Sequence, residues 1–342
     1  MNVGIDFGAH RLKSLRRHGH RLAGRSVRSI YSVVPDTDDY RDVLHKLHAL
    51  HAVCEGHLAV MGDHAEKLSW LCRIPYASLV PEGRIPDDDP PARQILGALA
   101  DCLIPAAESD QDVACFTVPG ADADRGRNLE FLKRIVRLRG YTPLPLSAGA
   151  ALVLAEGADN GFTGMGMSFG AESSSLSLVY QGREVASAAV PAGGNWIDQE
   201  LAARNAGYAW DNDGNCYIDT AEMRRWKESF AGSVQHTKGV REQTLARLYG
   251  EVTTGLLTAA RRAIERCPWL DGFRYPVPVI CGGGSSAIGG FESAMLGALD
   301  DHSLAVRTGG VRVVRDSVFT VARGCLIHAE LQAESRGERQ VA

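Results

Sequence analysis

An acid stands at the end of an apolar run near the start of the chain. The stretch reads Val3-Gly-Ile-Asp-Phe-Gly8, so Asp6 is followed two residues later by a glycine. A glycine turn can bring backbone N–H groups close to an anion, and a carboxylate beside it can hold a water or a Mg²⁺ ion. Asp6 and Gly8 therefore point to phosphate chemistry, provided that the rest of the chain supplies partners for them.

Two further glycine turns follow apolar strands. One lies within Met165–Tyr180, and the other is Cys281-Gly-Gly-Gly-Ser-Ser-Ala-Ile-Gly-Gly-Phe291, which precedes a helical pattern. Each turn alone could be a plain tight turn. Because backbone amides and helix N-termini both favour phosphate, the three turns together predict several walls of one anion site.

The elements that must position these turns alternate between strands and helices. Strands are predicted at Val3–Phe7, Leu58–Val60, Val113–Val118, Met165–Phe169, Leu176–Val179 and Val277–Ile280, from β-branched or alternating residues. Helical periodicity covers Ala92–Ala106, Asp124–Arg139, Ala148–Glu156, Trp196–Ala206, Thr220–Gly232 and Glu242–Arg266, and Gly140 is typical of a helix C-cap. This alternation predicts an α/β architecture.

Composition excludes several classes of protein. The 342 residues are 45% hydrophobic and 23% charged, with a net charge of −4, which is typical of a soluble protein of two sizeable domains and argues against a general nucleic-acid binder. No apolar run is long enough for a membrane span, and an acid at Asp6 interrupts any signal-peptide layout, so we expect a cytoplasmic protein. Eight cysteines without a CxxC pair indicate scattered buried thiols.

The run from Arg11 to Arg28 is basic and contains no acid. It predicts a hairpin with a solvated basic face, and the alternative is a patch for nucleic acid or an acidic partner.

The order of the motifs resembles the actin-like ATPase superfamily, specifically the nucleotide-binding domain of the heat shock protein 70 family (DnaK) and the bacterial actin MreB. The matching segments are Val3–Gly8 (first phosphate loop), Val60–Lys67, Phe116–Pro119 with Asp124-Arg125, Ala148–Leu152 (alanine-rich helix), Ser168–Ser173 (second phosphate loop), Gly193–Asp198, Cys281–Ser285 (adenosine loop) and Val321–Ile327 (closing helix). The resemblance covers nearly the whole chain.

The resemblance implies an actin-like ATPase fold, in which two related ribonuclease-H-like domains flank a nucleotide cleft. Domain I is expected over residues 1–157, with a C-terminal helix at 316–333 packing back on it. Domain II is expected over 158–315, with a small lobe at about 200–245, followed by a polar tail at 334–342.

The same resemblance implies which residues hold ATP or ADP with Mg²⁺. Asp6 would bind the Mg²⁺, and Asp6 and Asp198 are the candidate catalytic acids. The nucleotide contacts would come from Gly8, Ala9, His10, Arg11, Lys13, Gly170, Ala171, Ser173, Gly193, Gly194, Lys227, Gly282, Gly283, Gly284 and Ser285.

Parts of the family's machinery are replaced in this sequence. The second phosphate loop, normally D-x-G-G-G-T, reads Ser168-Phe-Gly-Ala-Glu-Ser173, so its aspartate is gone and Glu172 adds like charge beside a phosphate. The glutamate that the family has before the alanine-rich helix is absent, because this stretch reads Pro143-Leu-Pro-Leu-Ser147. Phosphoryl transfer to water depends on such positioned charges, so we expect slow ATP hydrolysis or none.

A second site is predicted in the small lobe. Residues Asp211–Glu222 resemble an EF-hand calcium loop between helical patterns, with Asp211, Asp213, Asn215, Tyr217, Asp219 and Glu222 as ligands. Cys216 stands where the loop needs glycine. The alternative is a solvated linker in which Asp219 caps the next helix and Glu222 completes a capping box.

Three functions are open at this point. The first is a DnaK-type ATP-binding protein with a chaperone-like or assembly role, whose partners would be a protein client or co-chaperone. The chain stops after the ATPase domain, so the family's peptide-binding domain is expected to be absent. The second is an MreB-like protein that self-assembles into filaments, and the third is a pseudo-ATPase scaffold. None requires a membrane or a nucleic acid.

Overall fold

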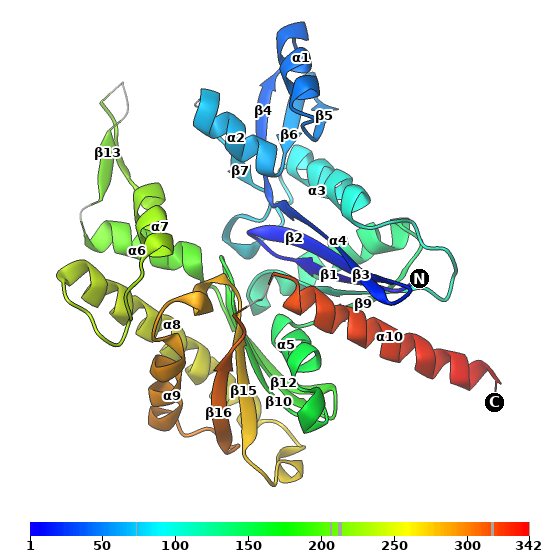
Figure 1. Ribbon diagram of the computed structural model, residues 1–342, viewed down its shortest axis with the longest axis vertical. Coiled ribbons are helices and arrows are strands. Elements are labelled where there is room, and N and C mark those ends of the chain that lie inside the picture. Colours follow the sequence, from blue (N-terminus) through cyan, green and yellow to red (C-terminus); the bar gives the residue numbers. More distant parts are fainter. Residues whose placement is uncertain (73, 206, 211–213, 316–317, 342) are drawn as a thin grey trace. The chain divides into compact units, whose positions relative to one another are not determined.

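The computed structural model describes residues 1–341 except 73, 206, 211–213 and 316–317, and it divides into two compact units (Figure 1). Unit 1 comprises Met1–Pro119, Ala123–Leu146 and Val321–Ala342. Unit 2 comprises Gly120–Asp122 and Ser147–Thr320. Within the described residues, no helix combines the length and apolar character needed to cross a membrane.

Unit 1 is built on a five-stranded sheet. Its order is β3 (Arg21–Arg28), β2 (Arg11–His18), β1 (Val3–Phe7), β8 (Val113–Thr117) and β9 (Thr142–Leu146). Neighbouring strands among β1, β2 and β3 are antiparallel, whereas β8 pairs with β1, and β9 with β8, in parallel. The basic run is therefore the predicted hairpin, formed by β2 and β3.

Helices cover this sheet because its central strands are almost entirely apolar. They are α3 (Pro90–Leu103), α4 (Asp122–Leu138) and α10 (Thr320–Val341). Phe7 and Phe116 meet edge-on in the core, with ring centroids 5.9 Å apart. Gly4 lets α10 lie directly on β1, since a Cβ there would be 2.1 Å from the carbonyl oxygen of Ala322.

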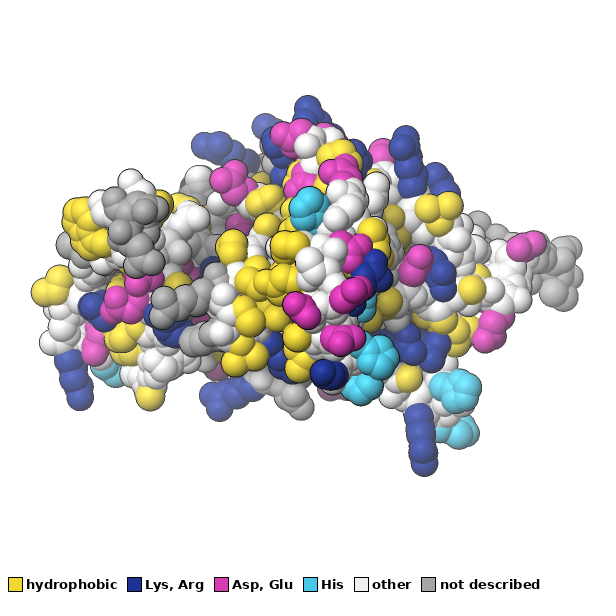
Figure 2. Space-filling model, turned by 90° about the horizontal axis from the view of Figure 1, so that it is seen from above, with side chains coloured by type: hydrophobic (Ala, Val, Ile, Leu, Met, Phe, Trp, Pro, Cys, Tyr) yellow, Lys and Arg dark blue, Asp and Glu magenta, His cyan; other side chains and the backbone are white. Residues whose placement is uncertain are grey.

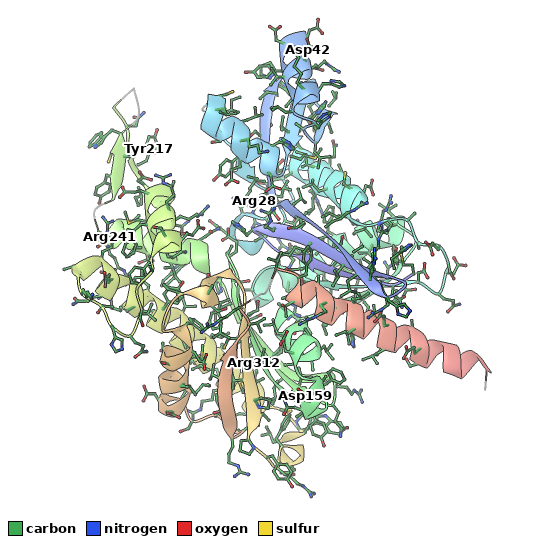
Figure 3. The ribbon with its side chains drawn as sticks, viewed as in Figure 1. Arg28, Asp42, Asp159, Tyr217, Arg241 and Arg312 are labelled. Carbon is green, nitrogen blue, oxygen red and sulfur yellow. The ribbon has the colours of Figure 1, made fainter. Side chains whose placement is uncertain are left out.

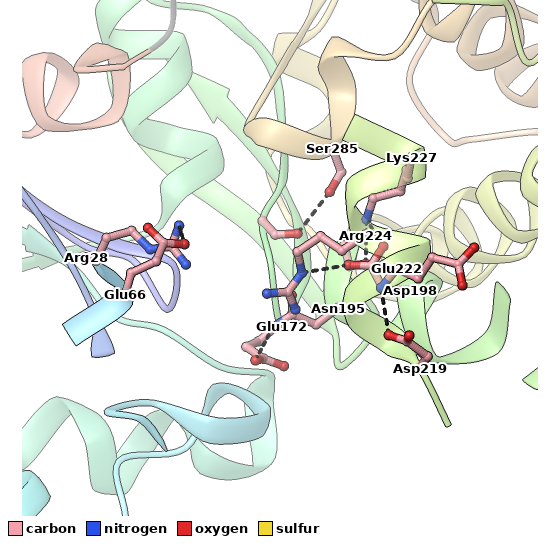
Figure 4. Close-up of polar contacts among 12 residues, drawn as sticks. Arg28, Glu66, Glu172, Asn195, Asp198, Asp219, Glu222, Arg224, Lys227 and Ser285 are labelled. Atoms are coloured by element: carbon pink, nitrogen blue, oxygen red, sulfur yellow. Dashed lines mark hydrogen bonds and ion pairs between the residues drawn. The ribbon is translucent and has the colours of Figure 1, made fainter. Parts of the chain in front are cut away.

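A smaller lobe of unit 1 has its own sheet and core. The strand order is β5 (His51–Cys54), β6 (His57–Met61), β4 (Ile30–Pro35) and β7 (Ala77–Ser78), packed with α1 (Asp38–Lys46) and α2 (Asp63–Cys72). Val34, Leu58 and Leu68 are among its buried residues. Arg28, at the end of β3, forms an ion pair of 3.2 Å with Glu66 on α2 (Figures 3 and 4).

Unit 2 repeats the sheet of unit 1. Its order is β12 (Arg183–Val190), β11 (Ser174–Tyr180), β10 (Gly164–Phe169), β15 (Val277–Gly282) and β16 (Thr308–Val313), again with an antiparallel trio followed by two parallel strands. The shared topology confirms the predicted fold class of two related α/β domains.

The two faces of the unit 2 sheet follow the alternation of β10. Met165, Met167 and Phe169 pack into a core with the long helix α8 (Val240–Glu265) and with α9 (Phe291–Asp301). On the opposite face, Gly164 and Gly166 lie under α5 (Ala148–Glu156). A small lobe of α6 (Gly194–Arg204), α7 (Thr220–Ser229) and the hairpin β13 (Tyr208–Trp210) and β14 (Cys216–Ile218) completes the unit.

Several element predictions hold and several need correction. Strand Val3–Phe7 and helix Ala148–Glu156 match the structure to the residue, and Gly140 ends α4 with a φ of +86° as expected for a C-cap. The strand Thr142–Leu146 was not predicted, and residues 334–341 continue α10 to Val341 where a separate polar tail was expected. Four cysteines are buried thiols as predicted, but Cys72, Cys102 and Cys216 are exposed.

Candidate functional site

Asp6 lies where three strands meet in unit 1. The register pairs Asp6 with Lys13 on β2 and with Thr117 on β8, so all three side chains point to the same face. Lys13 Nζ is 3.0 Å from one carboxylate oxygen of Asp6, and the Thr117 hydroxyl donates to the other at 3.0 Å. The structure thus brings two of the predicted residues together, and Thr117 joins them from the Thr-Val-Pro stretch.

Ser29 holds the turn between β1 and β2 in place through two hydrogen bonds. The Ser29 hydroxyl donates to the carbonyl of Gly8 at 2.7 Å, and the Ser29 N–H donates to the carbonyl of His10. Gly8 fits tightly, since a Cβ there would be 2.7 Å from the carbonyl oxygen of Arg11. This bonding fixes the path of the backbone through Gly8, Ala9 and His10.

The side chain of Arg11 contacts α2 and β3, in contrast to Lys13, which contacts Asp6. Its guanidinium forms an ion pair of 3.0 Å with Asp63 on α2 and donates to the Ser26 hydroxyl on β3. Sequence reasoning missed Asp63, because it lies more than fifty residues away on a helix that was not predicted. Of Arg11 and Lys13, the two basic residues predicted to contact the nucleotide from this hairpin, Lys13 is the one beside Asp6.

In unit 2, the turn after β10 collects contacts from two other segments. The carbonyl of Gly170 accepts the N–H of Gly194 at 2.9 Å and the hydroxyl of Ser285 at 3.3 Å, and the N–H of Asn195 donates to Ala171 at 2.8 Å. The Gly170 N–H in turn donates to the carbonyl of Ser173. The turn after β10, the glycine pair Gly193-Gly194 and the turn that contains Ser285 are therefore in direct contact.

This close approach depends on two glycines. A Cβ on Gly193 would be 2.5 Å from the carbonyl oxygen of Ala171. Gly283 has a φ of +96°, and a Cβ there would be 2.3 Å from the carbonyl oxygen of Phe169. Gly282 and Gly284 flank it, and Gly284 faces open space, with nothing within 4 Å of a Cβ. The N-terminus of α6, starting at Gly194, also lies at this turn, where its dipole favours an anion.

Lys227 reaches the same turn from α7. Its ammonium donates to the carbonyl of Gly194 at 2.7 Å and lies 2.7 Å from a carboxylate oxygen of Asp198 (Figure 4). Asp198 is 2% exposed and Lys227 is 10% exposed. Burial lowers the pKa of Lys227, and the charge of Asp198 acts in the opposite direction. Asp198 therefore stabilises the charged form of Lys227 in a nearly dry environment.

A chain of polar contacts extends this pair to the turn after β10. Arg224 Nε is 3.2 Å from Asp198, and the same guanidinium donates to the Asn195 side chain at 3.0 Å (Figure 4). Asn195 in turn donates to Glu172 at 2.6 Å. Sequence reasoning missed Arg224 and Asn195, although Arg224 stands one helical turn before Lys227 and Asn195 follows the glycine pair. Their contacts hold the added carboxylate of Glu172 in place.

The predicted calcium loop is only partly described. Asp211 and Asp213 lie outside the described residues. Asn215 directly precedes β14, and Tyr217 belongs to β14. The segment lies between α6 and α7, as the helical patterns on both sides predicted, but β13 separates it from α6 and β14 lies within it. Among the described residues, no group of three or more His, Cys, Asp or Glu side chains is placed to hold a metal ion.

Asp219 serves as the N-cap of α7, as the alternative interpretation predicted. Its carboxylate accepts the N–H of Glu222 at 2.8 Å. The backbone N–H of Asp219 donates to the carbonyl of Gly207. In a capping box this N–H would donate to the Glu222 carboxylate, so Gly207 takes the place of Glu222 here.

Asp219→Ala is expected to lower the free energy of unfolding by about 1 kcal/mol, because the first turn of α7 loses its cap. Urea denaturation with and without Ca²⁺ measures this, with the exposed, non-capping Asp271→Ala as a control near zero. A calcium site at 211–222 would stabilise the parent chain in Ca²⁺, and the variant would lose that increment. If Ca²⁺ does not stabilise the parent chain, the calcium prediction is wrong.

The comparisons with known proteins agree with this geometry at the level of the fold. The Volactin family model matches residues 1–329. A MamK double helical filament matches with a TM-score of 0.68 at 15% identity, over 96% of this chain and 98% of that one. MreB5 of Spiroplasma citri matches when bound to ADP (0.66, 13% identity, 98% of both chains) and to AMPPNP (0.65, 12% identity, 99% and 97%). No curated protein matches the chain in sequence.

These structural likenesses show that the chain has the actin-like ATPase fold, as the order of its motifs predicted. The predicted resemblance to the heat shock protein 70 family and MreB is confirmed at the level of the fold.

Proposed function

We propose, since the chain belongs to the Volactin family and has the actin-like ATPase fold, that it binds ATP and ADP and assembles with copies of itself into filaments. The proposal is supported by the similarity to a filament of MamK and to nucleotide-bound MreB5. These relatives favour the filament interpretation over the chaperone one.

The observation that carries the proposal is the convergence of three segments in unit 2. Gly170, Gly194 and Ser285 come from distant parts of the sequence, yet they contact one another directly, and Lys227 lies beside them. The contacts place the N-terminus of α6 and the ammonium of Lys227 at one turn, and a helix N-terminus and an ammonium both favour a polyphosphate. A plain tight turn would need none of these partners.

Nucleotide hydrolysis is proposed to be slow. Ser168 replaces the aspartate of the second phosphate loop. The stretch before α5 has no glutamate, and Ser147 at its end serves as the N-cap of α5, with its hydroxyl accepting the N–H of Ala150 at 3.1 Å. Asp198 is enclosed with Lys227 and Arg224, so its proposed role is to position Lys227. Asp6 is the proposed Mg²⁺ residue, with Lys13 supplying positive charge beside it.

Isothermal titration of the full chain with ATP and ADP, with and without Mg²⁺, tests nucleotide binding. Gly284→Glu is expected to weaken binding at least about tenfold, because it adds bulk and negative charge in open space beside Gly283 and Ser285. Gly310→Glu on β16 is the matched control, since a Cβ there also meets nothing within 4 Å.

Pelleting of the same samples tests filament formation. We expect the parent chain to sediment with ATP and to melt at a higher temperature when nucleotide is present, because a ligand of the native state stabilises it. No binding heat and no thermal shift at millimolar nucleotide would leave only the scaffold interpretation.

A further inference from the structure

The two faces of the β2–β3 hairpin differ in how their basic side chains are paired. Side chains alternate between the faces along each strand, and residues that pair across the strands share a face. On the face that also carries Asp6, every Arg and Lys side chain lies 3.2 Å or less from a carboxylate. The pairs are Arg11 with Asp63, Lys13 with Asp6, Arg17 with Glu330 and Arg28 with Glu66.

The opposite face carries basic side chains without such partners. The register places Arg16, Arg21 and Arg25 on it, together with His18. Among the residues that the structure describes, none of these three arginines forms an ion pair with a carboxylate. Arg25 donates to the carbonyl of Cys102 at the end of α3, which orients its side chain and leaves its charge in place. Basic side chains project from several parts of the surface drawn in Figure 2, so the lack of paired carboxylates, and not the number of basic residues, distinguishes this face.

The outer side of β3 is open. In the described part of the chain β3 pairs only with β2, so it forms an edge of the five-stranded sheet (Figure 1), and residues 21–25 are all exposed. A two-residue turn that begins with Gly19, at a φ of +58°, leads into Arg21, which therefore occupies a hydrogen-bonded position of the ladder with β2. Alternation then directs the backbone N–H and C=O of Leu22 and Gly24 away from β2, where a further strand can pair with them.

We propose that the outer edge of β3 binds an acidic, extended segment of another protein, which pairs with β3 as a further strand. Relative to that strand, Arg21 and Arg25 occupy non-hydrogen-bonded positions, where the Cα atoms of opposed residues are only about 4.5 Å apart. The two arginines lie four residues apart along β3, which is about 13 Å in an extended strand. Carboxylates four residues apart in the bound segment would therefore face both guanidinium groups, which bind carboxylates well.

The chemistry of this edge favours a peptide over a nucleic acid. The outward N–H and C=O groups of β3 match those of another peptide strand, and main-chain bonds of this kind supply affinity while the neighbouring side chains select the sequence. The net charge of the whole chain is −4, which disfavours a long polyanion. The inference goes beyond the proposed function, because it needs neither a nucleotide nor a filament.

Fluorescence anisotropy of two labelled peptides, titrated with the full chain, tests the inference. The peptide Thr-Glu-Val-Thr-Val-Glu-Thr has its acids four residues apart, and Thr-Glu-Val-Thr-Glu-Val-Thr has the same composition with its acids three residues apart. In the second peptide one carboxylate points to the other face of the strand. We expect the first peptide to bind about three- to fivefold more tightly, which is the contribution of one well-placed exposed ion pair.

Three variants separate the roles of charge and backbone. Arg21→Gln is expected to weaken binding of the first peptide about three- to fivefold and to remove its advantage over the second. Arg17→Gln, on the opposite face of the hairpin, is the matched control and is expected to change binding by less than about 1.5-fold. Leu22→Pro removes an outward N–H and no bond to β2, so both peptides are expected to bind at least about tenfold more weakly. Thermal unfolding checks that each variant is folded.

Two kinds of result would overturn the inference. Equal binding of the two peptides, equal effects of Arg21→Gln and Arg17→Gln, or no binding of either peptide would show that the arginines only protect the edge of the sheet from pairing. A single-stranded oligothymidylate of similar length that binds as tightly as the first peptide, and is insensitive to Leu22→Pro, would show a general polyanion patch in its place. Nucleotide titration of the parent chain is independent of all these results.

Discussion

Asp198→Asn is expected to lower the free energy of unfolding by about 3–5 kcal/mol, the cost of leaving a buried charge without its partner. The Lys227 ammonium is almost fully buried, and its countercharge is the Asp198 carboxylate at 2.7 Å. The neutral amide keeps the shape of the side chain but removes the charge. Urea denaturation monitored by circular dichroism measures the loss.

Two comparisons make this prediction specific to the buried pair. Glu200→Gln on the same helix α6 breaks an exposed ion pair with Arg204, and it is expected to change stability by less than about 0.5 kcal/mol. The double variant Asp198→Asn with Lys227→Met is expected to recover part of the loss, because the unpaired charge is gone. Equal effects of Asp198→Asn and Glu200→Gln would contradict the account of a buried charge pair.

Gly166→Ala is expected to destabilise the chain by about 3 kcal/mol, at the upper end of the usual cost of overpacking. A Cβ on Gly166 would lie 1.9 Å from the carbonyl oxygen of Gly149, and a Cβ on Gly149 would lie 2.5 Å from the carbonyl oxygen of Gly166. Both neighbours are backbone atoms, so α5 must move away from β10 to make room. Thermal and urea denaturation both report the loss.

Gly310→Ala is the control for this prediction. It changes a glycine in β16, a strand of the same sheet, where a Cβ meets nothing within 4 Å. We expect its stability to remain within about 0.5 kcal/mol of the parent chain or to rise, since alanine restricts the unfolded chain more than glycine does. A Gly166→Ala variant as stable as Gly310→Ala would show that α5 is not packed tightly on β10.

The fold was predictable where burial alone decides the local structure. β1 consists almost wholly of buried residues, and α5 is buried over its central residues Gly149–Leu154, so both elements follow from the apolar pattern. The strand Thr142–Leu146 escaped prediction because Pro143 and Pro145 argue against a strand, and only its position at the edge of the sheet permits them.

The candidate site was predictable only as a set of segments. The order of the glycine turns indicates which backbone stretches could surround a phosphate, and those in unit 2 do contact one another. The pairing of Asp198 with Lys227 and Arg224 could not be predicted, because it depends on how α7 packs against α6. The pairing of Arg11 with Asp63 depends in the same way on packing between remote elements.

The two prolines of β9 also affect how copies of this chain can crowd together. The N–H of Thr142 points inward and donates to Asp112, so alternation places Pro143 and Pro145 at the positions whose nitrogen faces outward. Proline has no hydrogen on that nitrogen. An extended segment of a neighbouring molecule that approaches the outer edge of β9 therefore meets carbonyl acceptors without the matching N–H donors. This lack of donors disfavours strand addition and amyloid-like stacking at β9, even at high local concentration.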